Sequence, residues 1–348
     1  MSGAPTRGPG PPRLATGMVL GKLLPPHAGH LYLIGFARRQ VERLAVVVEQ
    51  VAGETIPSAL RVRWLRELVP EADIVHLDQP MPQDPADHPH FWSLWREALR
   101  ERLPFVPAVV FASEAYGHRL AAELGARFLP ADPDRELFAV SGTRVRAAPS
   151  AWGHYLPAPV RDYYGLPAAP PPTRGEPRRI ALIGPESTGK TTLARRLAAA
   201  FDARWVPEYA QTLIASGNLR GPALSQADLE DFARGQWASE AELAALGGRV
   251  LFCDSDALTT QLYAEALFGH CPAWIAAAAR TRHYALTLVS APDVPWVDAA
   301  HRVDPAGRQA FFARCRAALA VLGRPAVILR GDWDQRFGQA CQAVERVL

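Results

Sequence analysis

Short apolar runs alternate with amphipathic stretches along most of the chain. In the first half, runs rich in β-branched residues are followed by segments whose apolar residues recur at helical spacing. The expected strands span residues 16–21, 43–51, 72–78 and 108–113, and the expected helices span 27–40, 58–70, 91–103 and 116–125. Strands that alternate with helices in this way indicate a parallel sheet covered by helices on both faces.

The second half repeats this alternation without repeating the sequence of the first. Strand-like runs occur at 178–184, 249–256, 283–290 and 325–331, and a helix-favouring stretch follows at 190–201. Between the halves, the segment 156–179 is rich in proline and has no sustained apolar period, which is typical of a linker. We therefore predict two doubly wound α/β domains, at 17–166 and 178–348, with a linker at 167–177 and a disordered tail at 1–16.

Composition fits this division and narrows the functional classes. A chain of 348 residues, with 49% hydrophobic and 21% charged side chains, can bury two separate cores. The net charge of +3 is too small to indicate a nucleic-acid-binding surface. No apolar run reaches the roughly 18 residues of a membrane span, and the first 16 residues lack the apolar segment of a secretory signal. The four cysteines form no CxxC pair, so we expect reduced thiols in a cytoplasmic protein.

Residues 184–191, GPESTGKT, match the phosphate-binding pattern G-x-x-x-x-G-K-[ST]. An apolar strand precedes the motif and a helix follows it, so successive backbone N–H groups and the helix dipole would face bound phosphate. Lys190 is expected to reach the β- and γ-phosphates, and the Thr191 hydroxyl to bind Mg²⁺. The expected ATP contacts are Gly184, Pro185, Glu186, Ser187, Thr188, Gly189, Lys190, Thr191 and Thr192.

Two acids are candidates for the chemistry beside this loop. Asp254 follows four apolar residues at the end of a strand, where a second Mg²⁺ ligand belongs. Glu208 follows a short apolar segment, and either acid suits the role of general base, so that choice stays open. Arg302 and Arg308 are candidates to close over the transferred phosphoryl group, although surface arginines are common.

The segment GKLLPPHAGH, residues 21–30, places His27 and His30 at the expected start of a helix. A metal site, a core packing role and a phosphate site are the alternatives. No acidic metal ligand follows closely, and Gly29 between the imidazoles indicates a close backbone approach. Because a helix N-terminus favours anions, phosphate binding is the interpretation that we prefer.

A second segment, VSGTRVR at 140–146, has the same character. Ser141 and Thr143 are typical of helix caps, and Arg146 lies on the same helix face as Thr143. Two hydroxyl groups and an arginine at a helix start indicate a second clamp for phosphate.

Together these segments resemble the (H/T)xGH and ISxTxxR signatures of the adenylyl-transferring nucleotidyltransferases. Joined to a P-loop domain, the combination resembles the bifunctional NadR-type family over roughly residues 17–348. The resemblance implies an N-terminal HxGH domain with a Rossmann-like fold that makes NAD and pyrophosphate from ATP and nicotinamide mononucleotide. It also implies a C-terminal P-loop kinase that phosphorylates nicotinamide riboside. Supporting segments are 111–117, 132–146, 207–211, 252–263 and 296–302.

The resemblance also implies roles for individual residues. His27 and His30 would contact the transferring phosphates, Lys22 and Arg146 would neutralise the departing pyrophosphate, and Ser141 and Thr143 would hold the β- and γ-phosphate oxygens. Mg²⁺ is expected as the counter-ion of ATP. Further ATP contacts are Gly21 and Gly29, and the candidate substrate-binding residues are Trp92, Trp95, Tyr209 and Asp256. The two tryptophans lie three residues apart on a helix, which is equally typical of core residues.

Other functions stay open at this point. Related transferases and kinases act on other substrates, and a nucleotide-sensing regulator with a weak or inactive kinase half is a further alternative. The regulator alternative rests on Gln211 and on Ala299–Ala300, where the family usually has an arginine and an acid followed by glycine. Some members also begin with a DNA-binding helix-turn-helix, which 16 residues cannot hold, so we expect small-molecule partners and no DNA binding. The sequence leaves homo-oligomer formation open.

Overall fold

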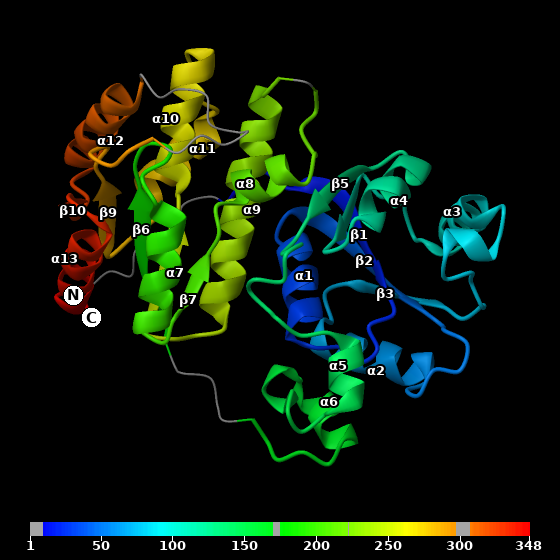
Figure 1. The fold of residues 1–348 in the computed structure, drawn as a ribbon. Helices are drawn as coiled ribbons and strands as arrows, with labels where there is room; N and C mark the ends of the chain where they lie inside the picture. Colours follow the sequence, from blue (N-terminus) through cyan, green and yellow to red (C-terminus); the bar gives the residue numbers. More distant parts are fainter. Residues whose placement is uncertain (1–9, 170–174, 222, 297–306) are drawn as a thin grey trace, which may run out of the picture. The chain divides into compact units, whose positions relative to one another are not determined.

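The computed structural model describes residues 10–169, 175–221, 223–296 and 307–348. The chain divides into two compact units (Figure 1): the first is Arg13–Pro171, and the second is Pro172–Leu348 together with Met1–Pro12. Each unit is built on its own five-stranded sheet. Among the described residues, no helix has the length and apolar character that crossing a membrane requires.

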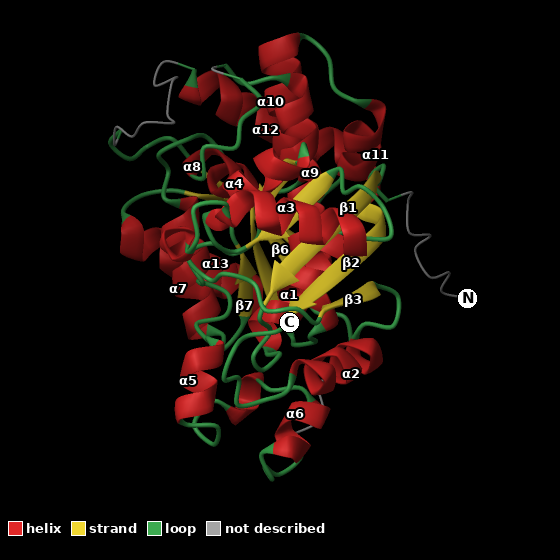
Figure 2. Ribbon diagram, turned by 90° about the vertical axis from the view of Figure 1, so that its right-hand side faces the viewer, coloured by secondary structure: helices red, strands yellow, loops and turns green. Residues whose placement is uncertain are grey.

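The sheet of the first unit has the strand order β3-β2-β1-β4-β5, and all neighbouring pairs are parallel. Figure 2 shows β1, β2 and β3 side by side. The strand order reverses at β1, which lies between β2 and β4, and open α/β sheets bind ligands beyond the carboxyl ends of the strands at such a point. The strands are β1 (Leu14–Gly21), β2 (Val41–Glu49), β3 (Asp73–Leu77), β4 (Val109–Ala112) and β5 (Arg127–Pro130).

Helices cover both faces of this sheet because successive strand residues point to opposite sides. Met18 and Leu20 contribute to the core beneath α3 (Phe91–Arg102) and α4 (Tyr116–Leu124). On the other side, Phe36 of α1 (Ala28–Arg38) packs edge-on against Phe111 of β4, with ring centroids 6.2 Å apart. The remaining elements of the first unit are α2 (Ser58–Leu68), α5 (Gly142–Ala147), α6 (Ala158–Tyr163) and the 3₁₀ turns Pro85–Asp87 and Gly153–Tyr155.

The second unit has the strand order β10-β9-β6-β8-β7, again with parallel pairs throughout. Its strands are β6 (Arg178–Ile183), β7 (Arg204–Val206), β8 (Val250–Asp254), β9 (Leu286–Ser290) and β10 (Ala326–Leu329). The central strand β6 is completely buried from Ile180 to Ile183. Ile180 and Leu182 pack with Leu193 and Leu197 of α7 (Lys190–Ala200) and with Val344 of α13 (Trp333–Glu345), which together cover one face.

The other helices of the second unit complete its layers. The long helix α9 packs against β7 and β8 and against its neighbour α10, which in turn contacts α11 and α12. These helices are α8 (Tyr209–Ala215), α9 (Gln226–Ala245), α10 (Ala257–Phe268), α11 (Ala273–Thr281) and α12 (Arg308–Leu322).

The predicted fold class, two α/β units with doubly wound parallel sheets, is confirmed. One boundary differs from the expectation. The first strand begins at Leu14, which pairs with Val41, so residues 14–16 lie in the sheet and not in a disordered tail. Residues 1–9 of the expected tail and 170–174 of the expected linker lie outside the described residues.

Candidate functional sites

The P-loop connects the buried carboxyl end of β6 to the start of α7. Gly184 has a φ of 137°, and a Cβ atom there would come within 2.7 Å of the Ser290 carbonyl oxygen. Gly189 has a φ of 76°, and a Cβ atom would come within 2.1 Å of the Trp333 ring. Both positions therefore need glycine for conformation and for space.

Side chains of the motif fold back on the loop itself. The Lys190 ammonium donates to the Pro185 carbonyl at 3.0 Å, and the Thr188 hydroxyl donates to the same oxygen at 2.8 Å. These contacts keep the lysine head over the loop, where its charge favours phosphate.

Asp254 and Thr191 form a pair of oxygen ligands at the foot of the loop. The Thr191 hydroxyl donates to Asp254 Oδ2 at 2.5 Å. Asp254 is fully buried, burial raises its pKa, and its Oδ1 has no hydrogen-bond partner among the described residues. A hydroxyl and a carboxylate are hard ligands of the kind that Mg²⁺ takes beside nucleotide phosphates, so these residues fit that ion.

Glu208, which precedes α8, belongs to the same electrostatic cluster. The pKa of Glu208 is raised to about 7, mainly by burial; Lys190 opposes this shift, and the nearby Asp254 and Glu186 contribute to it. A carboxyl group with this pKa exchanges a proton near neutral pH, which suits a general base.

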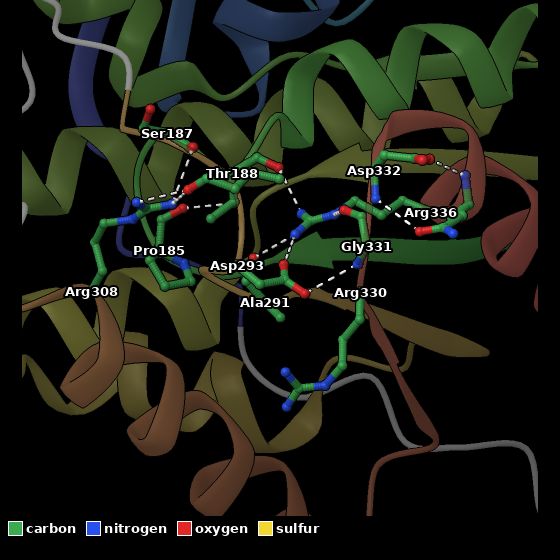
Figure 3. A network of polar contacts seen from close by, with 12 residues as sticks. Pro185, Ser187, Thr188, Ala291, Asp293, Arg308, Arg330, Gly331, Asp332 and Arg336 are labelled. Atoms are coloured by element: carbon green, nitrogen blue, oxygen red, sulfur yellow. Dashed lines mark hydrogen bonds and ion pairs between the residues drawn. The ribbon is translucent and has the colours of Figure 1, made fainter.

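Of the two predicted lid arginines, only Arg308 lies among the described residues; Arg302 lies outside them. The Arg308 guanidinium donates to the Ser187 carbonyl at 3.4 Å and to the Val294 carbonyl at 3.2 Å (Figure 3). The Arg308 side chain therefore contacts the backbone of the P-loop.

A cavity of about 420 Å³ opens beside the P-loop, and four of its lining residues were missed by sequence reasoning, two of them in α7 (Leu193 and Arg196) and two outside the motif and its helix. The latter two are Trp333 and Arg336, from the first turn of α13. Their motif, GDWDQR at 331–336, has an Asp332 cap but no catalytic pattern that would have distinguished it. The cavity is lined by Thr188, Gly189, Thr192, Leu193, Arg196, Trp333 and Arg336.

Asp256 and Tyr209 have structural partners that do not support their expected role in substrate binding. Asp256 is fully buried, caps α10 through the Thr259 N–H at 2.9 Å, and pairs with Arg324 at 2.7 Å. Tyr209 is 3% exposed and packs on α9, where a Cβ atom at Gly235 would come within 2.1 Å of its ring. The sequence could not distinguish these roles for Asp256, because aspartate is common both as a helix cap and as a substrate ligand.

In the first unit, His27 and His30 lie together at the start of α1. His27 caps the helix by accepting the His30 backbone N–H at 3.4 Å, and the two rings stack with centroids 3.7 Å apart. Burial lowers the pKa of His27 to about 4, with a further contribution from Arg135. Burial also lowers the pKa of His30 well below its usual value, and His27 adds to this shift. Both imidazoles are thus neutral hydrogen-bonding groups at pH 7.

The structure brings the two phosphate-type segments of this unit together. Arg146 of α5 donates to the Leu24 carbonyl, and its other guanidinium nitrogen lies 3.4 Å from the Thr143 hydroxyl. A Cβ atom at Gly142 would come within 2.2 Å of the Leu24 oxygen, so α5 packs directly on the loop after β1. Ser141 caps α5 by accepting the Arg144 N–H at 3.3 Å.

A buried arginine that the sequence did not reveal supports the same loop. Arg61 of α2 is completely buried and donates to the Lys22 carbonyl, to the Glu49 carbonyl at 3.1 Å and to the Glu54 carboxylate. The Lys22 side chain itself is exposed beyond Gly21. Arg61 therefore fixes the backbone that carries Lys22.

The expected stacking tryptophans are packed against the protein. Trp95 is 5% exposed, and its indole N–H donates to the Pro82 carbonyl at 3.0 Å. Trp92 is half-buried, lies edge-on to Phe91 and has the Arg119 guanidinium over its ring. The helical spacing thus corresponds to packing against the protein, the second of the two interpretations that the sequence allowed, and stacking on a substrate stays a prediction.

The fold and the P-loop define an α/β protein with a phosphate-binding unit, and comparisons with known proteins agree. Residues 179–336 match the model of a family described as an AAA domain. The chain is similar to the trifunctional NAD biosynthesis/regulator protein NadR of Escherichia coli (strain K12) and of Salmonella typhimurium (strain LT2). Each is 26% identical over 299 residues, covering 81% of this chain and 70% of the relative.

Solved structures were also matched. A crystal structure of a NadR protein in complex with NR aligns with a TM-score of 0.44 at 22% identity, over 97% of both chains. A crystal structure of a NadR protein in complex with NAD and AMP-PNP aligns with a TM-score of 0.40 at 22% identity, over 96% of both chains.

Proposed function

We propose that this chain is a bifunctional enzyme of NAD synthesis. The first unit transfers the adenylyl group of ATP to nicotinamide mononucleotide, which gives NAD and pyrophosphate. The second unit phosphorylates nicotinamide riboside with ATP. The observation that carries the proposal is the packing of α5 on the loop after β1, which unites two distant phosphate-type segments in a chain that also contains a P-loop. The similarity to NadR proteins across 81% of the chain supports the substrates.

In the first unit, the phosphate of the mononucleotide attacks the α-phosphorus of ATP, so no nucleophilic side chain is needed. Catalysis then depends on alignment and on stabilising the developing charge. His27 and His30, which their low pKa values keep neutral, each retain one imidazole N–H that donates a hydrogen bond to a phosphate oxygen. Lys22 and Arg146 balance the charge of pyrophosphate, while Ser141, Thr143, Gly21 and Gly29 complete the contacts with ATP.

In the second unit, Glu208 accepts the proton of the attacking ribose hydroxyl, and Lys190 binds the β- and γ-phosphates. Asp254 is engaged by Thr191, which favours a role for both as ligands of Mg²⁺ and leaves Glu208 as the base. Bound Mg²⁺ would neutralise phosphate charge during transfer.

One assay tests both halves. The full chain is incubated with nicotinamide riboside, ATP and Mg²⁺, and the mononucleotide, NAD and pyrophosphate are quantified separately. We expect the mononucleotide to form first and NAD with stoichiometric pyrophosphate to follow. Mononucleotide without NAD would contradict the transferase, and absence of turnover with riboside would contradict the kinase.

A further inference from the structure

The carbonyl groups of the P-loop are held by side-chain donors. When successive N–H groups of a loop converge on a phosphate, its carbonyls point elsewhere and need partners of their own. Here the Pro185 carbonyl receives Lys190 and Thr188, and the Ser187 carbonyl receives Arg308 at 3.4 Å. The Thr188 carbonyl receives Nη1 of Arg336 at 3.2 Å.

Arg336, like Arg308, reaches the loop from a distant part of the chain, and it is the more deeply buried of the two at 1% exposed. Its Nε donates to the Gly331 carbonyl at 2.9 Å, and its Nη2 donates to the Ala291 carbonyl at 2.8 Å and to the Asp293 carboxylate. Figure 3 shows the guanidinium between the P-loop, the segment after β9 and the turn before α13. All of its nitrogens are therefore used to join three backbone segments.

The Asp293 carboxylate completes this junction. Its second oxygen accepts the Gly331 N–H at 3.1 Å, so one carboxylate holds both the guanidinium and the turn before α13. The same turn leads to Trp333, whose ring fills the space beside Gly189. The backbone of the P-loop and the wall of the neighbouring cavity thus share one ion pair, in which Arg336 is buried and the Asp293 side chain is 32% exposed.

We propose that Arg336 is a positioning residue for nucleotide phosphates at the P-loop. By fixing the Thr188 carbonyl, it orients the peptide groups whose N–H donors face the phosphate, and it sets the distance between that loop and the cavity wall. An arginine is required because only its planar fork offers several donors in fixed directions. A lysine keeps the charge but cannot reach the same acceptors together. This proposal rests on the nucleotide binding that we propose for the second unit.

The test measures binding by titration calorimetry on the full chain with ATP and Mg²⁺. Lys190→Ala defines the component of the isotherm that belongs to the P-loop. We expect Arg336→Lys to weaken that component at least about tenfold, the loss typical of one charge-assisted hydrogen bond, and to leave the remaining component unchanged. The affinity for adenosine, measured by competition with ATP, should change less than the affinity for ATP, because adenosine has no phosphates.

A merely structural role would lower the unfolding temperature of Arg336→Lys while the folded protein bound ATP with wild-type affinity, and that result would overturn the proposal. If Arg336→Lys does not fold, Asp293→Asn replaces one acceptor by a donor and retains the three carbonyl contacts. We expect a weakening of about threefold to tenfold for that variant, and unchanged affinity would equally overturn the proposal. A wild-type chain that binds ATP at the P-loop without phosphorylating riboside would contradict the kinase function alone.

Discussion

The stacked imidazoles of His27 and His30 show how burial selects the chemistry of a side chain. Desolvation keeps both rings neutral in the free protein, so the contribution that we propose for them in adenylyl transfer is hydrogen bonding and not a resident positive charge. A neutral donor gains strength as charge develops on the phosphate, which stabilises the transition state more than the ground state.

We expect His30→Ala to lower kcat/KM for NAD formation by at least ~10²-fold, as for removal of an oxyanion donor. The measurement is pyrophosphate release with saturating Mg²⁺ and nicotinamide mononucleotide. Riboside phosphorylation by the same variant is the control, and it should be unchanged because His30 belongs to the other unit. Near-normal NAD formation would contradict the proposed role.

Glu208 should make the proposed kinase reaction dependent on pH. Its pKa of about 7 means that the carboxyl group is increasingly protonated, and therefore inactive as a base, as the pH falls below 7. We expect kcat/KM for riboside phosphorylation to fall about tenfold per pH unit in that range and Glu208→Gln to remove most of the activity. If the residual activity of Glu208→Gln fell with pH in the same range, the titrating group would be another one, such as the ATP phosphate, and the assignment would be contradicted.

The contacts of individual residues were harder to predict from the sequence than the helices and strands. Lys190, Thr191 and Asp254 could be placed because a known loop pattern fixes their geometry around a strand and a helix. The structural role of Asp256 could not be predicted because its buried ion pair involves Arg324, a residue 68 positions away. Arg61 and Arg336 were missed for the same reason, since their partners are backbone carbonyls of distant segments.

At the scale of elements, the short helix α5 matters through its contact with the loop after β1. Gly142→Ala would place a Cβ atom 2.2 Å from the Leu24 oxygen, so the helix must move away. We expect a loss of about 1–3 kcal/mol in stability and a large loss of NAD formation. Chemical denaturation and the pyrophosphate assay measure the two effects.

The matched control is Gly338→Ala in α13. A Cβ atom there meets nothing within 4 Å, so the same change of side chain occurs without a steric conflict. We expect stability to rise by about 0.5–1 kcal/mol because alanine favours helices, with NAD formation unchanged. Equal effects of the two substitutions would mean that the contact of Gly142 is unimportant.

The alternation of apolar runs was sufficient to predict most strands because buried parallel strands are continuous hydrophobic segments. It did not reveal β5 or β7, which are short strands at the sheet edges. Their sequences, RFLP and RWV, contain only two consecutive apolar residues each, whereas β4 and β10, which also have four residues, are continuous apolar runs. The start of β1 was also missed, because the pairing of Leu14 with Val41 is a long-range interaction.

At the scale of the whole molecule, the two sheets predict separable activities. Lys190→Ala removes the cation of the P-loop but leaves the first unit intact. We expect riboside phosphorylation to be abolished, while NAD formation from added mononucleotide continues at the wild-type rate. Comparing the two substrates in the same variant tests this separation, and joint loss of both activities would contradict independent sites.

Both motif loops leave the central strand of their sheets, because β1 lies between β2 and β4 and β6 lies between β8 and β9. Backbone amides of these strands are hydrogen-bonded between neighbours on both sides, and their segments 18–20 and 180–183 are buried. In amide hydrogen exchange they should be among the last of each unit to exchange, whereas β5 and β7 exchange earlier by local fraying. Each phosphate loop thus emerges from backbone that opens only when its whole unit unfolds.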